Sequence, residues 1–104
     1  MIIVSSSSIA GKKIVKTLGL VRGNTIRARN IGKDILAGFK NIIGGEIEEY
    51  TKLMAEAREQ ALDRMAERAE ELGANAIIDV RFSTSYIMGA ASEILAFGTA
   101  VIIE

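Results

Sequence analysis

The feature that constrains this chain most is a long amphipathic helix, predicted from Glu46 to Leu72. At about 100° per residue, its apolar side chains gather on one side and span an arc of about 220°, whereas one-sided burial needs only about 100°. Three glutamates stand in the first turn, where they meet the positive end of the helix dipole. Gly73 follows directly and can adopt the left-handed conformation that ends a helix. The rest of the chain must therefore cover an unusually wide apolar surface.

The apolar arc has two parts that differ in side-chain size. The large side chains, which suit packing on a sheet, are Tyr50, Leu53, Met54 and Leu72. The smaller ones, which permit close approach of another element, are Ala55, Leu62, Ala66 and Ala69. A wide stripe does not by itself distinguish between two covers for the small edge, a short helix of the same chain or a second subunit.

The first third of the chain predicts strands. Met1 to Val4 is a short apolar segment typical of an edge strand, and Ser5 to Ser8 follow as a polar turn. Lys12 to Arg29 is rich in β-branched residues and predicts one long, bent strand, with Gly19 and Gly23 as bulges or points of close backbone approach. A hairpin that turns at Gly23 and Asn24 is the alternative, but its two arms would be unequal.

A second, shorter helix is predicted from Ile31 to Ile43. Its apolar residues recur at helical spacing on a single face, Asn30 is a suitable N-cap, and Gly44 with Gly45 ends it. This is the only additional helix that the chain offers to cover the long one.

Two further strands are predicted after Gly73. Ala76 to Tyr86 alternates, with one apolar and one polar face, and 88–92 forms the hairpin loop. The apolar face is formed by Ile78, Val80, Phe82 and Tyr86, and the polar face by Asp79, Arg81, Ser83 and Ser85. The last strand, Ile94 to Ile103, is apolar on both faces, which is typical of a central strand covered on both sides. The helices cover only one side, so we expect a partner outside the chain, most simply a second copy.

Composition limits the class of protein. The 104 residues predict a single α+β domain, 1–104, with 49% hydrophobic residues, 25% charged residues and no net charge. There is no cysteine, hence no disulfide or thiolate chemistry, and no apolar run long enough for a leader or a membrane helix, so we expect a cytoplasmic protein. Residues 1–45 carry eight Lys or Arg and one acid, whereas 46–104 carry five and twelve, so the halves attract. We expect no nucleic acid partner, because the basic half lacks aromatic stacking platforms.

Several motifs together resemble the YbjQ-type proteins, a family of small uncharacterised proteins labelled as heavy-metal-binding. The matching motifs are Gly19-Leu20-Val21-x-Gly23, Arg29-Asn30, Asp34, Gly44-Gly45, Tyr50, Ala57-Arg58, Leu72-Gly73-Ala74-Asn75-Ala76 and Gly98-Thr99-Ala100. The resemblance implies a subunit like that of dodecin. In it, three long antiparallel strands in the order 1-3-2 pack against the helix. It also implies a homopentamer.

The metal label that the resemblance brings fits these residues poorly. Soft metals prefer thiolate, thioether or imidazole ligands, and the chain has no cysteine and no histidine. The densest set of oxygen ligands is an acidic stripe on the long helix: Glu56, Glu59, Asp63, Glu67 and Glu70. Such a stripe is more typical of a solvated helix face than of a cation site. We therefore assign no metal ligand and no cofactor.

Five polar residues are hard to explain by packing, and they form our candidate cluster: Arg29, Asn30, Asp34, Tyr50 and Arg58. They suit either an anion-binding site or, slightly better, a buried network of ion pairs. Arg58 stands within the apolar arc, and Asp34 is the acid best placed to pair with it. We assign no catalytic residue, because the chain has no histidine to activate a serine and acid–base work would fall to Asp, Tyr or Lys. An oligomer that binds a metal ion or a small ligand at or between subunits is favoured, with a structural scaffold or such an enzyme as alternatives.

Overall fold

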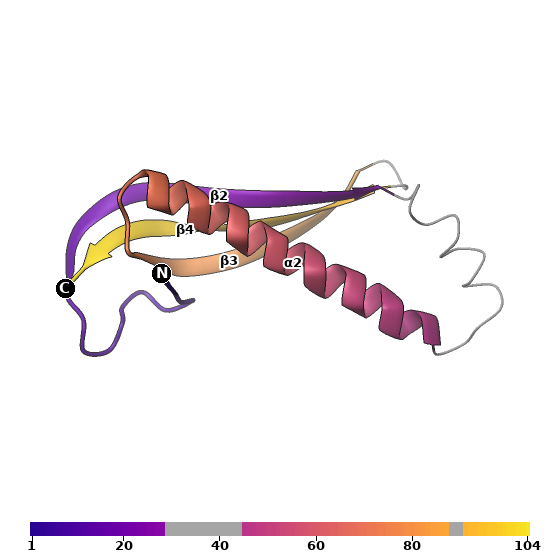
Figure 1. Cartoon of the computed structure of the whole chain (residues 1–104), viewed down its shortest axis with the longest axis horizontal. Coiled ribbons are helices and arrows are strands. Elements are labelled where there is room, and N and C mark those ends of the chain that lie inside the picture. The colour runs from indigo at the N-terminus through magenta and orange to yellow at the C-terminus, as the bar shows by residue number, and fades with distance from the viewer. Residues whose placement is uncertain (29–44, 88–90) are drawn as a thin grey trace.

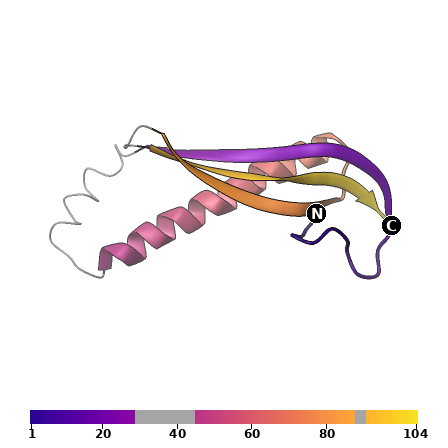
Figure 2. The ribbon, with the colours of Figure 1, turned by 180° about the vertical axis from the view of Figure 1, so that it is seen from behind.

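The computed structural model describes residues 1–28, 45–87 and 91–104. Its elements are β1 (Ile2–Ile3), β2 (Ile14–Ala28), α2 (Gly45–Glu71), β3 (Ala76–Ile87) and β4 (Ala91–Ile103). Figure 1 shows α2 crossing the sheet diagonally, with its first turns diverging from the strands, and Figure 2 shows the same arrangement from behind. The predicted α+β class is confirmed. The predicted helix Ile31–Ile43 lies outside the described ranges.

The sheet has four strands in the order β1-β3-β4-β2. Its three long strands are antiparallel neighbours in the expected order, with β4 in the centre. The short β1 pairs in parallel with β3 through Ile2↔Ala76 and Ile3↔Ile77, so the whole sheet is mixed. β4 begins at Ala91, earlier than the predicted Ile94, and the 88–90 connection lies outside the described residues. Among the described helices, none is long and apolar enough to cross a membrane.

The long helix ends as predicted. Gly73 adopts a φ of 87°, which only glycine reaches at little cost. Its N–H donates to the Glu70 carbonyl at 2.9 Å, and the Ala74 N–H donates to the Ala69 carbonyl at 3.0 Å. This pair of bonds is a Schellman motif, which satisfies carbonyls that the last helical turn leaves without partners. The chain then turns directly into β3.

β2 is one long strand, which confirms the long-strand prediction over the hairpin. Its register shifts between Thr17 and Gly19, and Gly19 has a φ of 120°, so Gly19 marks a bulge. Gly23 has the other predicted role. A Cβ built on it would lie 2.3 Å from the Ala61 carbonyl oxygen and 2.4 Å from the Met65 backbone nitrogen. The absence of a side chain at Gly23 therefore lets the helix backbone touch the sheet.

The residues of α2 that press on the sheet differ from those we expected. The fully buried set is Ala57, Ala61, Met65 and Ala69, each 0% exposed. Leu53 and Met54 are only partly buried, and Leu72 is 50% exposed, so the large side chains do not form the main contact. The physical reason is the close approach at Gly23, which leaves room for alanines and one methionine but not for a layer of leucines.

β3 contains a bulge that the sequence pattern conceals. Its register against β4 shifts between Ile78 and Arg81, and Asp79 has a φ of 54°. Ile77 and Val80 consequently join the core beneath α2, whereas Ile78 joins a smaller cluster on the other face. The prediction that Ile78 and Val80 share a face is therefore wrong, because an extra residue at a bulge reverses the alternation beyond it.

The backbone at Asp79 yields a first prediction. Left-handed φ costs most residues about 1 to 2 kcal/mol, and glycine adopts it freely. We expect Asp79→Gly to leave the free energy of unfolding unchanged or slightly raised, and Asp79→Ala to lower it by about 1 kcal/mol. Urea unfolding of both variants at one protein concentration is the measurement. Equal losses in the two variants would show that the side chain of Asp79 matters more than its backbone.

The described residues cover only part of the face of the sheet opposite α2, which we call the helix-free face because no described helix packs on it. Val101 and Ile103 of β4 pack there with Ala76 and Ile78, and the N-terminal segment contributes Val4 and Ile9 to this cluster. The N-terminal segment is thus an internal cover that our sequence reasoning did not foresee. This segment covers only one end of β4. Leu95 and Phe97, farther along the same face, remain partly exposed.

Candidate functional site

The structure places only part of the predicted polar cluster. Arg29, Asn30 and Asp34 lie outside the described residues, as does the side chain of Tyr50, although its backbone belongs to α2. Arg58 is on α2 and exposed. The expected contact between Arg58 and Asp34 therefore stays a prediction. The described residues indicate a different candidate site, a groove between β2 and α2.

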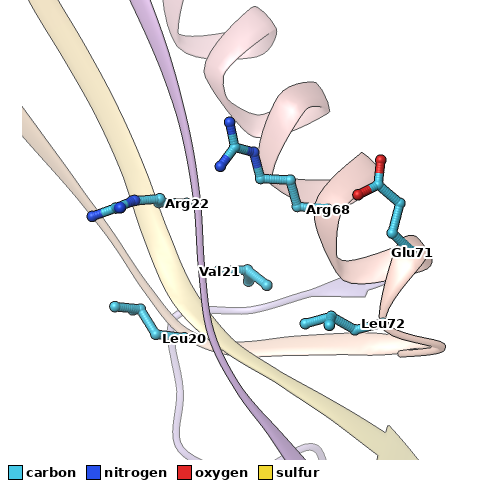
Figure 3. A pocket seen from close by; sticks show the side chains of 6 residues that line it. All are labelled: Leu20, Val21, Arg22, Arg68, Glu71 and Leu72. Carbon is cyan, nitrogen blue, oxygen red and sulfur yellow. The ribbon is translucent and has the colours of Figure 1, made fainter.

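A groove of about 360 Å³ lies between β2 and the last turns of α2. It is lined by Leu20, Val21, Arg22, Arg68, Glu71 and Leu72. Figure 3 shows Arg68 extending toward β2 and Arg22 extending from β2 on the side away from the helix. Val21 is 3% exposed and forms the floor, while Leu20 at 68% and Leu72 at 50% stand at the rim. An apolar floor with a few polar groups around it is the usual composition of a small-ligand site.

The groove carries more positive than negative charge. Its lining includes two arginines, Arg22 and Arg68, and one acid, Glu71. Neither arginine side chain makes a hydrogen bond or ion pair with another described residue. Their neighbour Arg64 is occupied, since its Nη1 donates to the Asn24 carbonyl at 2.6 Å and fastens α2 to β2. Arg22 and Arg68 are therefore available to an anion that lies across the edge of β2.

Sequence reasoning missed this groove. From the sequence, Arg68 is explained as a cation that interacts favourably with the C-terminal end of the helix dipole. The structure does place it in the last turn of α2. Arg22 reads as an ordinary solvated strand residue. The one sequence signal was the position of Arg22 within the Gly19–Gly23 motif. That signal does not show that the last turns of the helix lie beside it.

The serine turn has a structural role. The Ser6 hydroxyl donates to the Ser8 carbonyl at 2.7 Å, as expected for local bonding, and the Ser7 hydroxyl donates to Asp79 Oδ1 at 2.8 Å. Arg81 Nη1 donates to the Ser5 carbonyl at 2.8 Å. These bonds hold the N-terminal segment, residues 1–9, over the bulge of β3, so the serines contribute to the fold.

Thr25 is the one buried side-chain polar group that lacks a partner within the described residues. It is 3% exposed, and its Oγ1 accepts and donates no hydrogen bond there. Burying a hydroxyl without a partner costs about 1–3 kcal/mol, and valine has the same shape. We expect Thr25→Val to raise the free energy of unfolding by about 1 kcal/mol in urea unfolding, with Thr17→Val on the exposed part of β2 as the control. A loss of stability would indicate that the hydroxyl has a partner.

The acidic stripe on α2 is exposed along its length, as predicted for a solvated face. In the part of the chain that the structure describes, no three carboxylate, imidazole or thiol groups gather closely enough to hold a metal ion.

Comparison with known proteins identifies the family. The model of the YbjQ family, described as "Putative heavy-metal-binding", matches residues 1–104. The chain belongs to this family. It is 62% identical over 104 residues to a UPF0145 protein of Dehalococcoides mccartyi, covering 100% of both chains. It is 55% identical over 101 residues to a UPF0145 protein of Methanosarcina acetivorans, covering 97% of this chain and 95% of that one. These names give no function.

A solved structure shares the fold of this YbjQ protein. It is a protein of unknown function of the DUF74 family from Pediococcus pentosaceus, with a TM-score of 0.66 over 100% of this chain and 98% of that one. At 18% sequence identity this likeness shows the fold alone. The family model and the two relatives confirm the sequence resemblance to YbjQ-type proteins.

Proposed function

We propose that this YbjQ protein functions as a cytoplasmic homo-oligomer that binds a small anionic ligand at or between its subunits. The observation that supports self-association best is an apolar surface on the helix-free face that the described residues leave exposed. Leu20 is 68% exposed and Ile26 55% exposed, and Leu95 and Phe97 beside them are partly exposed. Burying a leucine or isoleucine side chain contributes about 1.5–3 kcal/mol, so covering this surface strongly favours association. The number five rests only on the family resemblance. With no cysteine, the chain has no disulfide that would require an oxidising compartment, which is compatible with the cytoplasm.

The distribution of charge along the chain favours a second copy of the same chain as the partner. Residues 1–28 contain five Lys or Arg and no acid, whereas residues 45–87 contain ten acids and five Lys or Arg. Surfaces of opposite sign on one chain are complementary when two copies meet, and such complementarity sets orientation more than affinity.

The ligand proposal rests on the groove. Its two arginines, which pair with no described residue, suit a carboxylate or phosphate, and its apolar floor suits a short hydrocarbon body. Because Arg22 lies on the outer strand of the sheet, a second copy that adjoins β2 would close the groove. A soft heavy metal is disfavoured in this chain, since neither cysteine nor histidine is present.

Thermal shift measurements test the ligand proposal. Phosphate, pyrophosphate and citrate are compared with chloride at matched ionic strength, so that general screening is held constant. A ligand that binds only the folded protein raises Tm, and we expect at least one of the three anions to do so. Arg68→Gln should abolish the shift, while Lys52→Gln, an exposed position elsewhere on α2, should retain it. Identical shifts in both variants would place the anion site outside the groove and overturn the groove proposal. No shift in the native protein would favour the alternative of a structural scaffold without ligand.

A further inference from the structure

The outer edge of β2 is long, and no described strand pairs with it. β2 contains 15 residues, ends the sheet on one side, and pairs only with β4 among the described strands. A long edge strand presents backbone N–H and C=O groups that readily pair with another strand. Proteins usually shorten, charge or cover such edges, so an open one of this length points to a partner strand.

The opposite edge of the sheet is open over half its length. β1 pairs with β3 at Ala76 and Ile77 only, and the backbone bonds from the N-terminal segment end at Val80, whose N–H donates to the Val4 carbonyl at 3.1 Å. From Phe82 to Ile87, the structure describes no strand on the outer side of β3. This stretch is the second open edge.

The two open edges lie at the same level of the sheet. Phe97 of β4 pairs with Arg22 of β2 and Arg81 of β3, and Glu93 pairs with Ile26 and Ser85. The edge segments 22–28 and 81–87 therefore flank the same segment of β4, and they match in length. Both strands are antiparallel to β4 and hence run parallel to each other.

α2 covers the side of the sheet near β2 and leaves the side near β3 largely uncovered. The helix packs mainly on β2, less on β4 and least on β3. Phe82 of β3 lies on the helix side, because it pairs with the buried Ala96, yet it is 46% exposed. If β2 of another copy adjoined β3, the helix that overlies that β2 would lie next to Phe82. One contact would thus close both edges and cover an exposed aromatic ring.

We propose that the copies join edge to edge, with β2 of one chain pairing in parallel with β3 of the next. This deepens the proposed function and rests on it, since it names the surface through which the oligomer forms. The contact joins two different surfaces, so it is head-to-tail. It continues the sheet from copy to copy with the helices on one side, and it forms a ring where the rotation between copies closes. The groove then lies at the end of each pairing, between neighbours.

Disulfide crosslinking tests this contact. Because the chain has no native cysteine, only the introduced cysteines can form disulfides. Four double variants combine Arg22→Cys or Ile26→Cys with Ser83→Cys or Ser85→Cys, all exposed positions on the helix-free face. Several pairs are used because the register between copies is an outcome of the experiment. Within one chain these positions are separated by β4, about 10 Å apart, which is beyond the reach of a disulfide. The four single variants are the controls.

After mild oxidation, we expect at least one double variant to form a ladder beyond the dimer on a non-reducing gel, and the single variants to remain monomers there. A head-to-tail contact predicts this pattern because each chain bonds two neighbours. Dimers from single variants would overturn the proposal, since like edges would then meet. It is also overturned if all double variants stay monomeric on the gel while light scattering shows an intact oligomer. A native protein that is monomeric by light scattering would instead overturn the proposed oligomer itself.

Discussion

Gly23→Ala is expected to lower the free energy of unfolding by about 3 kcal/mol or more. The added Cβ would lie 2.3 Å from the Ala61 carbonyl oxygen and 2.4 Å from the Met65 nitrogen, and both atoms belong to the helix backbone. Backbone cannot yield by changing a rotamer, so α2 as a whole must move away from β2. This movement would also loosen the bond from Arg64 to the Asn24 carbonyl.

Urea unfolding at a fixed protein concentration measures this effect, because the stability of an oligomer depends on concentration. Lys16→Ala on the same strand is the matched control, since Lys16 is exposed and its loss should change stability by about 0.5 kcal/mol or less. A Gly23→Ala protein as stable as this control would contradict the close helix–sheet contact.

Ile77→Ala is the second substitution from which we expect a large loss, about 3 kcal/mol. Ile77 is 0% exposed and belongs to the core beneath α2. Its Cγ2 atom lies only 2.9 Å from the position that a Cβ on Gly98 would occupy, so it fills the space that this glycine leaves. Truncating it opens a cavity against closely packed backbone, and such a site collapses poorly.

A graded series makes the measurement of Ile77 specific. Ile77→Val should cost about 1 kcal/mol, because one methylene is lost. Ile3→Ala, at the partner position on β1 and 36% exposed, should cost less than Ile77→Ala. Equal costs for Ile3→Ala and Ile77→Ala in the same chemical unfolding assay would mean that Ile77 is not the core residue described here.

Much of the fold could be predicted because local chemistry determines it. Glutamates and Gly73 define the ends of α2, and β-branched residues with two glycines define the long, bulged β2. The central position of β4 followed from its two apolar faces. The predictions that failed concern features that tertiary contacts determine. Helical periodicity gives the width of an apolar arc but not the part of it that presses on the sheet, which here is chosen by Gly23.

The bulge at Asp79 shows the same limit in a strand. The alternation from Ala76 to Tyr86 looks continuous, and one aspartate within it is only a weak sign of irregularity. The bulge is held by the N-terminal segment, through the Asp79 N–H to the Ser6 carbonyl at 3.0 Å. That partner is distant in sequence, so no local pattern reveals it. For the candidate site, the groove needs two elements side by side, and Arg22 and Arg68 become neighbours only after folding.

Self-association of the chain underlies both the proposed function and the proposed contact between β2 and β3. Size-exclusion chromatography with multi-angle light scattering at micromolar concentration tests it most directly. We expect one species with a mass several times the 11.2 kDa of the chain, five times for the ring that the family resemblance implies. A single stable species of 11.2 kDa under the same conditions would contradict the claim.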